Sequence, residues 1–291
     1  MSGTPAAHLL PAAISKLRAA NVTDPARDAR LLLAFAMDVA PDRLLLHMQD
    51  GLGAGQARRF AELIAGRVQR RPVSQLIGAR QFYGRSFKVT QDVLDPRPET
   101  EVLIEAALDE PFQTLLDLGT GSGAILLTLL AERAGARGLG VDISKAALAV
   151  ARDTRDTFGL AARAELRQSD WLEKVAGRFD LITCNPPYID ASVHAQLEPE
   201  PRLWEPQIAL TPGADGLQVY RMLAPQLPDH LAPGGRVLFE VGAGQADDVA
   251  GFCAEAGLRD VEIVQDLDGR GRVVAARSHN ECGFFANTVI R

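Results

Sequence analysis

Apolar residues along this chain change their spacing twice, which divides the sequence into three parts. In residues 5–78 they recur at the three- and four-residue intervals of amphipathic helices. Residues 79–96 alternate apolar and polar side chains around a turn, which predicts a β-hairpin. In residues 97–277, short apolar runs alternate with helical patterns, as is typical of an α/β domain with a mostly parallel sheet.

The first part is predicted to be a small helical bundle that occupies residues 1–78. Prolines and glycines break it into five short segments, and helices this short do not persist unless they pack on one another. Because the bundle has no polar cluster, it is typical of a docking module rather than a reactive one. We expect residues 79–96 to be a linker, residues 97–277 the domain that carries the chemistry, and residues 278–291 a tail of unknown role.

The larger domain is predicted to hold seven strands, the last two joined as a hairpin. They span residues 114–118, 138–141, 164–167, 179–184, 235–241, 261–265 and 272–276. Residues 189–212 are predicted to form a long loop without secondary structure. Loops of this kind beside a site usually cover or bind a substrate.

The strand at 179–184 stops abruptly at Asn185-Pro186-Pro187-Tyr188. Proline has no N–H and a fixed φ, so the two prolines end the strand and hold the backbone still. The Asn185 side-chain oxygen and the Pro186 carbonyl are neighbouring acceptors that suit a planar NH2 group. We therefore predict Asn185, Pro186 and Tyr188 as catalytic residues and all four as substrate contacts. A plain turn at Asn-Pro, with Tyr188 in the core, is the alternative.

A glycine loop, Gly119-Thr120-Gly121-Ser122-Gly123, joins a buried strand to an apolar helix. Glycines let the backbone approach a ligand, and the helix directs free N–H groups at it. The loop also fits the dinucleotide pattern, with Asp142 as the ribose-binding acid. Two features favour S-adenosylmethionine over NAD: Asp117 could hold an amino group, and Asp170-Trp171 could receive an adenine. The predicted cofactor contacts are Asp117, Gly119, Thr120, Gly121, Ser122, Gly123, Asp142, Asp170, Trp171 and Asn185.

A stiff stretch, Asp95-Pro96-Arg97-Pro98-Glu99-Thr100-Glu101, precedes the first helix of the larger domain. Two interpretations fit this stretch equally well. In the first it is a rigid start of that helix, and in the second it is a wall of the active site. On the second interpretation, Arg97 and Glu99 contact the substrate.

Composition narrows the classes of function. The 291 residues are 47% apolar and 23% charged, which is ordinary for a soluble globular protein. The three cysteines, Cys184, Cys253 and Cys282, lack paired spacing, so we expect free thiols in a reducing compartment. The five histidines are scattered, so no metal site is expected. No signal peptide and no membrane span is recognisable, and we expect a cytoplasmic protein without a membrane partner.

Charge differs between the two ends of the chain. Residues 1–80 hold 11 Lys and Arg against 6 Asp and Glu, whereas residues 81–291 hold 20 against 31. The first part is mildly basic, which suits an acidic protein or RNA but is also compatible with a solvated face. The acidic second part argues against a long nucleic-acid groove, so no stable nucleic-acid partner is expected.

Three stretches in this order behind a helical domain resemble the HemK (PrmC-type) protein-glutamine methyltransferases, which modify peptide chain release factors. They are residues 95–101, 117–124 and 185–188, and the resemblance covers about residues 10–277. The first stretch is the most specific, although family members often have Ile where this chain has Asp95.

The resemblance implies a class I S-adenosylmethionine-dependent methyltransferase with a Rossmann-like fold. Its sheet would have seven mostly parallel strands and a C-terminal antiparallel hairpin, behind the helical bundle. The implied reaction methylates the side-chain amide nitrogen of the glutamine in the release-factor Gly-Gly-Gln motif and leaves S-adenosylhomocysteine. Gly119–Gly123, Asp142, Trp171 and Asn185 would bind the cofactor, and residues 185–188 the glutamine.

Other readings remain open at this point. The planar NH2 group could belong to a glutamine of a ribosomal protein, or to an adenine or guanine in nucleic acid. A nicotinamide oxidoreductase or a silent binding module fits the glycine loop, but neither explains Asn185-Pro186-Pro187-Tyr188.

Overall fold

The computed structural model describes residues 4–213 and 215–279, so most of the predicted tail, with Cys282, lies outside the described residues. The chain divides into two compact units. The helical unit comprises Met1–Arg80, Val89–Gln91 and Leu197–Glu205. The sheet unit comprises Gln81–Lys88, Asp92–Gln196 and Pro206–Arg291. Within the described residues, no helix is both long and apolar enough to cross a membrane.

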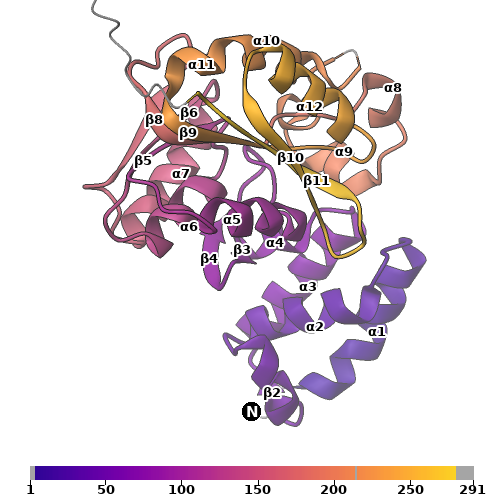
Figure 1. Cartoon of the computed structure of the whole chain (residues 1–291). Coiled ribbons are helices and arrows are strands. Elements are labelled where there is room, and N and C mark those ends of the chain that lie inside the picture. Colours follow the sequence, from indigo (N-terminus) through magenta and orange to yellow (C-terminus); the bar gives the residue numbers. More distant parts are fainter. Residues whose placement is uncertain (1–3, 214, 280–291) are drawn as a thin grey trace, which may run out of the picture. The chain divides into compact units, whose positions relative to one another are not determined.

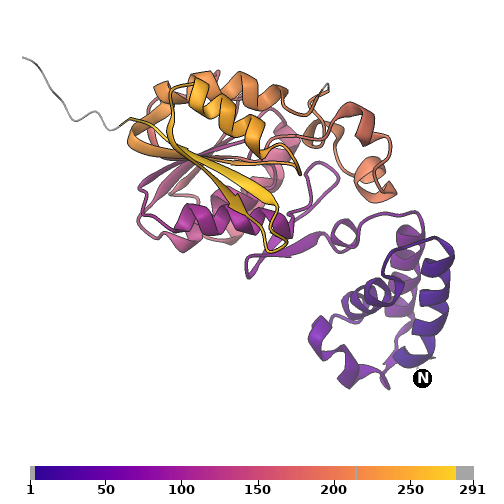
Figure 2. The same ribbon diagram turned by 45° about the vertical axis from the view of Figure 1, so that its right-hand side comes forward.

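The helical unit contains the five predicted helical segments (Figure 2). They are α1 (Ala6–Ala19), α2 (Pro25–Ala36), the 3-10 helix η1 (Pro41–His47), α3 (Ala54–Val68) and α4 (Val73–Ile77). Asp24 caps α2 by accepting a hydrogen bond from the Arg27 N–H at 3.1 Å. Apolar residues from α1, α2 and α3, among them Leu17, Leu32 and Phe60, meet in one buried core. Two-residue strands, β1 (Thr4–Pro5) and β2 (Gly51–Leu52), pair antiparallel and were not predicted.

A segment distant in sequence completes the helical unit. Residues 189–212 were predicted to lack secondary structure, but they hold α8 (Ala191–His194), α9 (Pro199–Trp204) and the 3-10 helix η3 (Gln207–Ala209). The structure places α9 in the helical unit, whereas the sequence assigned it to the larger domain. The reason is a set of ion pairs: Glu200 accepts hydrogen bonds from Arg67 at 2.7 Å and from Arg70 at 2.6 and 2.7 Å.

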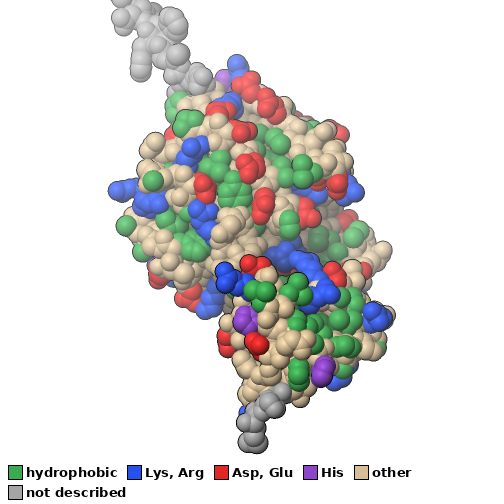
Figure 3. Space-filling view, turned by 90° about the horizontal axis from the view of Figure 1, so that it is seen from below, with side chains coloured by type: hydrophobic (Ala, Val, Ile, Leu, Met, Phe, Trp, Pro, Cys, Tyr) green, Lys and Arg blue, Asp and Glu red, His purple; other side chains and the backbone are tan. Residues whose placement is uncertain are grey.

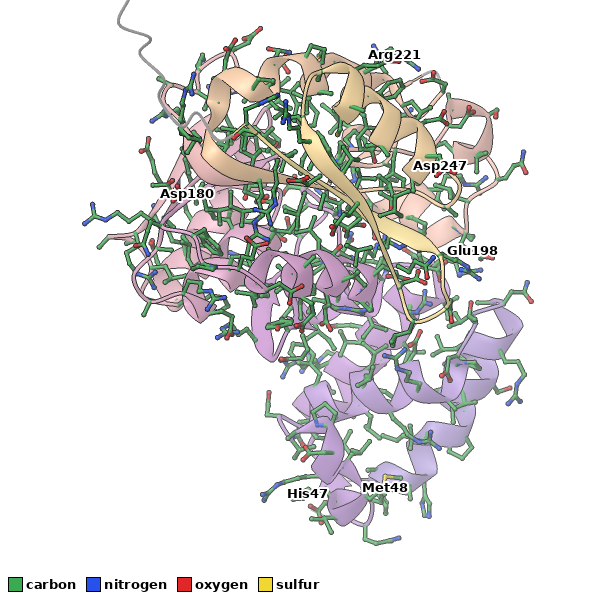
Figure 4. The ribbon with its side chains drawn as sticks, in the orientation of Figure 1. His47, Met48, Asp180, Glu198, Arg221 and Asp247 are labelled. Carbon is green, nitrogen blue, oxygen red and sulfur yellow. The ribbon has the colours of Figure 1, made fainter. Side chains whose placement is uncertain are left out.

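Two further contacts hold the same segment. Glu198, labelled in Figure 4, lies 3.1 Å from Arg70, and the Trp204 indole N–H donates to the Gln69 carbonyl at 3.1 Å. The pattern of apolar residues could not reveal this placement, because the contacts are polar and join residues about 130 positions apart.

The sheet unit confirms the predicted seven-stranded sheet, in the order β10-β11-β9-β8-β5-β6-β7. Its strands are β5 (Thr114–Leu118), β6 (Arg137–Asp142), β7 (Ala164–Gln168), β8 (Phe179–Cys184), β9 (Leu231–Glu240), β10 (Arg259–Gln265) and β11 (Gly271–Arg277). Strands β5 to β9 run parallel to their neighbours among these five strands. Strand β11 is antiparallel to both β9 and β10. The predicted hairpin before them is β3 (Ala79–Phe82) with β4 (Arg85–Lys88).

Helices cover both faces of this sheet (Figure 1). Neighbouring strand residues point to opposite faces: Leu115 and Leu181 lie in one core, and Leu116 and Ile182 in the other. The first core is completed by α5 (Glu101–Leu108), α6 (Ala124–Glu132) and α7 (Lys145–Thr157). The second is completed by α10 (Gln218–Leu223), α11 (Leu227–His230) and α12 (Ala246–Glu255). The 3-10 helix η4 (Ala224–Gln226) joins α10 to α11.

The order of the strands fixes where a ligand can bind. Strand β5 lies between β6 and β8, so the chain runs outward on one side of β5 before it crosses to the other. Loops at the carboxyl ends of such strands separate and leave a crevice. The glycine loop after β5 and Asn185 after β8 both lie at this crevice.

Candidate active site

The glycine loop is held in a backbone conformation that only glycine adopts freely. Gly119, Gly121 and Gly123 have φ angles of +70°, +55° and +81°. At Gly119 a Cβ atom would lie 3.4 Å from the Trp171 ring, so a side chain there would also narrow the crevice. The loop leads directly into α6, whose first free N–H groups and dipole face the same side.

Asp142 ends β6 beside this loop and is fixed by backbone donors. Its carboxylate accepts hydrogen bonds from the Gly121 N–H at 2.9 Å and the Ser144 N–H at 2.8 Å. Burial raises the pKa of Asp142, and these two hydrogen bonds oppose the rise. A carboxylate has about four acceptor positions, so capacity remains for a pair of ligand hydroxyls.

Asp117 lies near the end of β5, directly before the glycine loop. It is buried on β5 and accepts hydrogen bonds from the hydroxyls of Thr120 at 2.6 Å and Thr183 at 2.8 Å. Burial raises its pKa to about 6 against the effect of these hydroxyls. Asp117 therefore braces the glycine loop against β8, and its contact with a cofactor stays a prediction.

A cavity of about 310 Å³ opens at the crevice. The predicted residues that line it are Gly119, Gly121, Asp142, Asp170, Trp171, Asn185 and Pro187. The predicted residues that are not among its lining are Asp117, Thr120, Ser122, Gly123, Pro186, Tyr188, Arg97 and Glu99. The structure thus gathers around one cavity the acids and the aromatic ring expected to contact a nucleoside. The roles of the residues in both groups stay predictions.

Sequence reasoning missed much of the wall of this cavity. The walls include the residues Asp92, Val93, Leu94, Ile143, Ser144, Ala147, Pro206, Ile208, Ala209, Thr211, Pro212, Gln218, Val219 and Met222. The only available signal was the long connection after Tyr188, whose return part forms one wall. Apolar side chains on several sides make the cavity suitable for a flat, largely apolar ring.

Asn185 connects this cavity to the stiff stretch at residues 95–101. Its side-chain Nδ2 donates to the Thr100 hydroxyl at 3.3 Å. Thr100 ends the 3-10 helix η2 (Pro98–Thr100), which runs directly into α5. The stretch therefore starts the helix, as the first interpretation expected, and its Thr100 contacts Asn185. The second interpretation, with Arg97 and Glu99 as substrate contacts, stays a prediction.

Tyr188 is fixed rather than free to move. Its backbone carbonyl accepts a hydrogen bond from Gln245 at 3.0 Å, and its ring packs against the core beneath α10 and α12. Burial raises the pKa of its hydroxyl well above the ordinary range, so Tyr188 stays protonated at physiological pH. Core packing and a site contact are both compatible with this position.

Sequence reasoning also missed Glu240. This residue ends β9, next to the strand that carries Asn185, and it is fully buried. The available signal was an acid at the end of an otherwise apolar run, Val237-Leu238-Phe239. Such an acid is unusual in a core.

Comparisons with known proteins identify relatives of both parts of the chain. A family described as the PrmC N-terminal domain matches residues 8–78, and one described as the methyltransferase small domain matches residues 90–203. The chain is similar to the release factor glutamine methyltransferase of Cereibacter sphaeroides, with 56% identity over 272 residues, 94% of this chain and 98% of that protein. It is also similar to that of Rhodospirillum rubrum, with 46% identity over 265 residues, 90% of this chain and 82% of that protein.

Solved structures add the fold. The crystal structure of a methyltransferase from Pyrococcus furiosus superimposes with a TM-score of 0.53 at 14% identity and covers 77% of this chain and 99% of its own. At this identity the likeness is one of architecture.

Proposed function

The chain belongs to the release factor glutamine methyltransferase family, and from that premise we propose that it methylates the side-chain amide nitrogen of the glutamine in the Gly-Gly-Gln motif of peptide chain release factors. It is an S-adenosylmethionine-dependent protein-(glutamine-N5) methyltransferase with the class I, Rossmann-like fold. The observation that carries the proposal is the position of Asn185, which lines the cofactor cavity and is tied to Thr100 by its own amide.

The residues of the cavity fit S-adenosylmethionine. Asp142 retains acceptor positions for ribose hydroxyls, and Trp171 and Ile143 supply flat and apolar surface for an adenine. The glycine loop leaves space that a Cβ at Gly119 would restrict. When bound, the cofactor supplies a methyl group on a positively charged sulfur. We propose that Asp170 and the remaining residues of the glycine loop complete this binding site.

An amide nitrogen is a poor nucleophile, because its lone pair is delocalised into the carbonyl. In our proposal the Asn185 side-chain oxygen and the Pro186 carbonyl each accept one hydrogen of the substrate amide and so orient its nitrogen. Positioning of this kind can contribute about 7–11 kcal/mol. The same two acceptors favour the positive charge that develops on nitrogen, and the methylated nitrogen then readily loses a proton.

The acceptor pair also explains selectivity between glutamine and glutamate. A glutamate carboxylate would place acceptors against acceptors, so the site would reject it by about 10⁴-fold or more. Pro187, Tyr188, Arg97 and Glu99 complete the substrate contacts in this proposal.

The helical bundle, residues 1–78, is proposed to dock the protein substrate, with residues 79–96 as linker and residues 97–277 as catalytic domain. Figure 3 shows acidic, basic and hydrophobic side chains intermixed on the visible face. A mixed surface suits a protein partner better than the repeated phosphates of nucleic acid. We propose a cytoplasmic location, where translation takes place, and no stable nucleic-acid partner.

A methyl-transfer assay with labelled S-adenosylmethionine tests the proposal. The acceptors are a purified release factor, its Gly-Gly-Gln→Gly-Gly-Ala and Gly-Gly-Gln→Gly-Gly-Glu variants, and total RNA and DNA. We expect label on the wild-type factor alone. Label on nucleic acid, or on the variant factors, would overturn the proposal.

A further inference from the structure

Glu240 lies beside Asn185 at the end of the neighbouring strand. Cys184 of β8 is in register with Phe239 of β9, so Asn185 and Glu240 are the next residues on two adjacent parallel strands. The backbone of Glu240 is fixed, because its carbonyl accepts a hydrogen bond from the Tyr220 hydroxyl at 2.7 Å. Its side chain is 0% exposed.

The carboxylate of Glu240 lacks the partners that a buried acid normally has. Within the part of the chain that the structure describes, neither of its oxygens accepts a hydrogen bond of standard geometry. Arg272 of β11, the cation whose charge acts on Glu240, instead contacts Asp266 at 3.1 Å and the Val241 carbonyl at 3.3 Å. A buried carboxylate without a hydrogen bond of standard geometry or a contacting cation destabilises a fold, so its presence here calls for a reason other than stability.

The titratable and polar groups that interact with Glu240 come from several elements. They are Arg272 from β11, Glu99 and Thr100 from η2, Cys184, Asn185 and Tyr188 from β8 and the loop after it, and Tyr220 from α10. Burial raises the pKa of Glu240 to about 7, while the Thr100 hydroxyl, Arg272 and the Asn185 amide act to lower it. Thr100 and Asn185 are therefore close enough to Glu240 to favour its ionised form.

The side-chain amide of Asn185 can adopt two orientations, and Glu240 can select between them. Its oxygen and its NH2 end are nearly equal in size, so the group fits its site either way round. Only one orientation presents the oxygen to a substrate NH2. Thr100, which receives the Nδ2 hydrogen bond at 3.3 Å, does not decide between them, because a hydroxyl can both donate and accept.

An ionised carboxylate accepts only, and this property fixes the direction of a chain of hydrogen bonds. If the Thr100 hydroxyl donates to Glu240, its oxygen can only accept from Asn185. The Nδ2 end of Asn185 then faces Thr100 and Glu240, and the oxygen end faces the cavity.

We propose that Glu240, acting through Thr100, is a positioning residue that holds the Asn185 side-chain oxygen toward the substrate amide. This inference rests on the proposed function, since it assigns Asn185 the role of acceptor for the glutamine NH2 group. It adds a determinant from a different strand, outside the Asn-Pro-Pro-Tyr motif.

The test compares Glu240→Gln with Glu262→Gln, which makes the same change at an exposed position of the same sheet. The glutamine side chain of the Glu240→Gln variant can both donate and accept, so it no longer fixes the direction of the hydrogen bonds between Asn185, Thr100 and residue 240. We expect kcat to fall roughly 100-fold, as on loss of one oriented group in an active site. KM for the release factor should stay within about threefold, because the site remains formed. Glu262→Gln should behave as the wild type.

Two further readouts separate positioning from a structural role. The kcat of the wild type should rise with pH as Glu240 ionises, around its pKa of about 7, and Glu240→Gln should lack this rise. Thr100→Val and the double variant should lose about as much kcat as Glu240→Gln alone, because they break the same chain. A kcat within about threefold of the wild type, an unchanged pH profile, or losses that multiply would overturn the proposal.

A measurement on the free protein makes the inference independent of turnover. The Asn185 side-chain NH2 resonances should shift between pH 5.5 and 8.5 in the wild type and stay constant in Glu240→Gln. No shift in the wild type, or the same shift in the variant, would overturn the link. If the wild type shows the shift but methylates no release factor, the proposed function fails and the orientation of Asn185 by Glu240 stands.

Discussion

The acids in the two halves of the active site differ in the number of hydrogen bonds that their carboxylates accept. On the cofactor side, Asp117 and Asp142 each accept two hydrogen bonds, at 2.6–2.8 Å and 2.8–2.9 Å. On the amide side, Glu240 is fully buried but accepts none of standard geometry from the described residues. The cofactor half is thus a satisfied polar network, whereas the amide half retains an acid in an unfavourable setting.

A fourth acid, Glu200 in the helical unit, shows what a structural role looks like. Glu200 accepts three hydrogen bonds from Arg67 and Arg70, at 2.6 and 2.7 Å. Burial raises its pKa, but these arginines outweigh burial and the net pKa is lowered. Paired acids of this kind hold a fold together, whereas a buried acid without an ion pair, next to a residue of the active site, is typical of function.

The largest expected effect concerns Asn185 itself. Asn185→Ala should lower methyl transfer by roughly 10³-fold, because the variant loses an acceptor that aligns the substrate amide. Cofactor affinity, measured by isothermal titration, should stay within a few-fold. Unchanged turnover would remove Asn185 from the mechanism.

The next largest effect is on the pH dependence of the free energy of unfolding, which Glu240 should change. Its pKa is raised from 4.5 to about 7, so the folded protein binds this proton more tightly than the unfolded chain does. The wild type should therefore lose stability relative to Glu240→Gln as pH rises from about 4.5 to 7, by on the order of 3 kcal/mol. Thermal unfolding of both proteins at pH 5 and pH 7.5 measures this. A variant that is less stable than the wild type at pH 7.5 would assign Glu240 a structural role.

On the cofactor side, Asp142→Asn should weaken binding of S-adenosylmethionine about 10- to 100-fold. The Gly121 and Ser144 N–H groups both donate to this side chain, and an amide can accept from only one of them. The unsatisfied donor accounts for roughly 1–3 kcal/mol. KM for the release factor should change little, and a large increase in it would place Asp142 on the substrate side instead.

The smallest effect belongs to the helical unit. Glu200→Gln should destabilise the attachment of α9 by about 1–2 kcal/mol, because Arg67 and Arg70 lose a charged partner. Since the pKa of Glu200 is lowered, its contribution is present above pH 4.5 and lost as pH falls below it. Limited proteolysis should cut residues 197–205 faster in the variant at pH 7, with Glu255→Gln, exposed at the end of α12, as control. Equal rates would show that these ion pairs do not hold the segment.

Local patterns were enough to predict the sheet and its hairpin. Each strand buries side chains such as Leu115 and Leu116 on opposite faces, so the strands appear as continuous apolar runs between turns. The glycine loop and Asn185-Pro186-Pro187-Tyr188 were equally visible, because positive φ angles and proline geometry restrict which residues can occur.

Contacts between side chains remote in sequence could not be predicted in this way. The pairing of Glu200 with Arg70 spans 130 residues, and Thr100 reaches Asn185 across 85. The hydrogen bonds of Asp117 could not be predicted for a related reason, since its sequence position beside the loop does not show that the Thr120 and Thr183 hydroxyls donate to its carboxylate. Glu240 was overlooked because its neighbours are set by the register of β8 and β9.

The central claim is that the acceptor pair at Asn185 and Pro186 delivers a methyl group to one glutamine amide. Mass spectrometry of a release factor after incubation with the enzyme and S-adenosylmethionine tests it most directly. The account predicts a single added methyl group on the side-chain nitrogen of the Gly-Gly-Gln glutamine, and none after incubation with Asn185→Ala. A methyl group on another residue, or equal modification by Asn185→Ala, would contradict it.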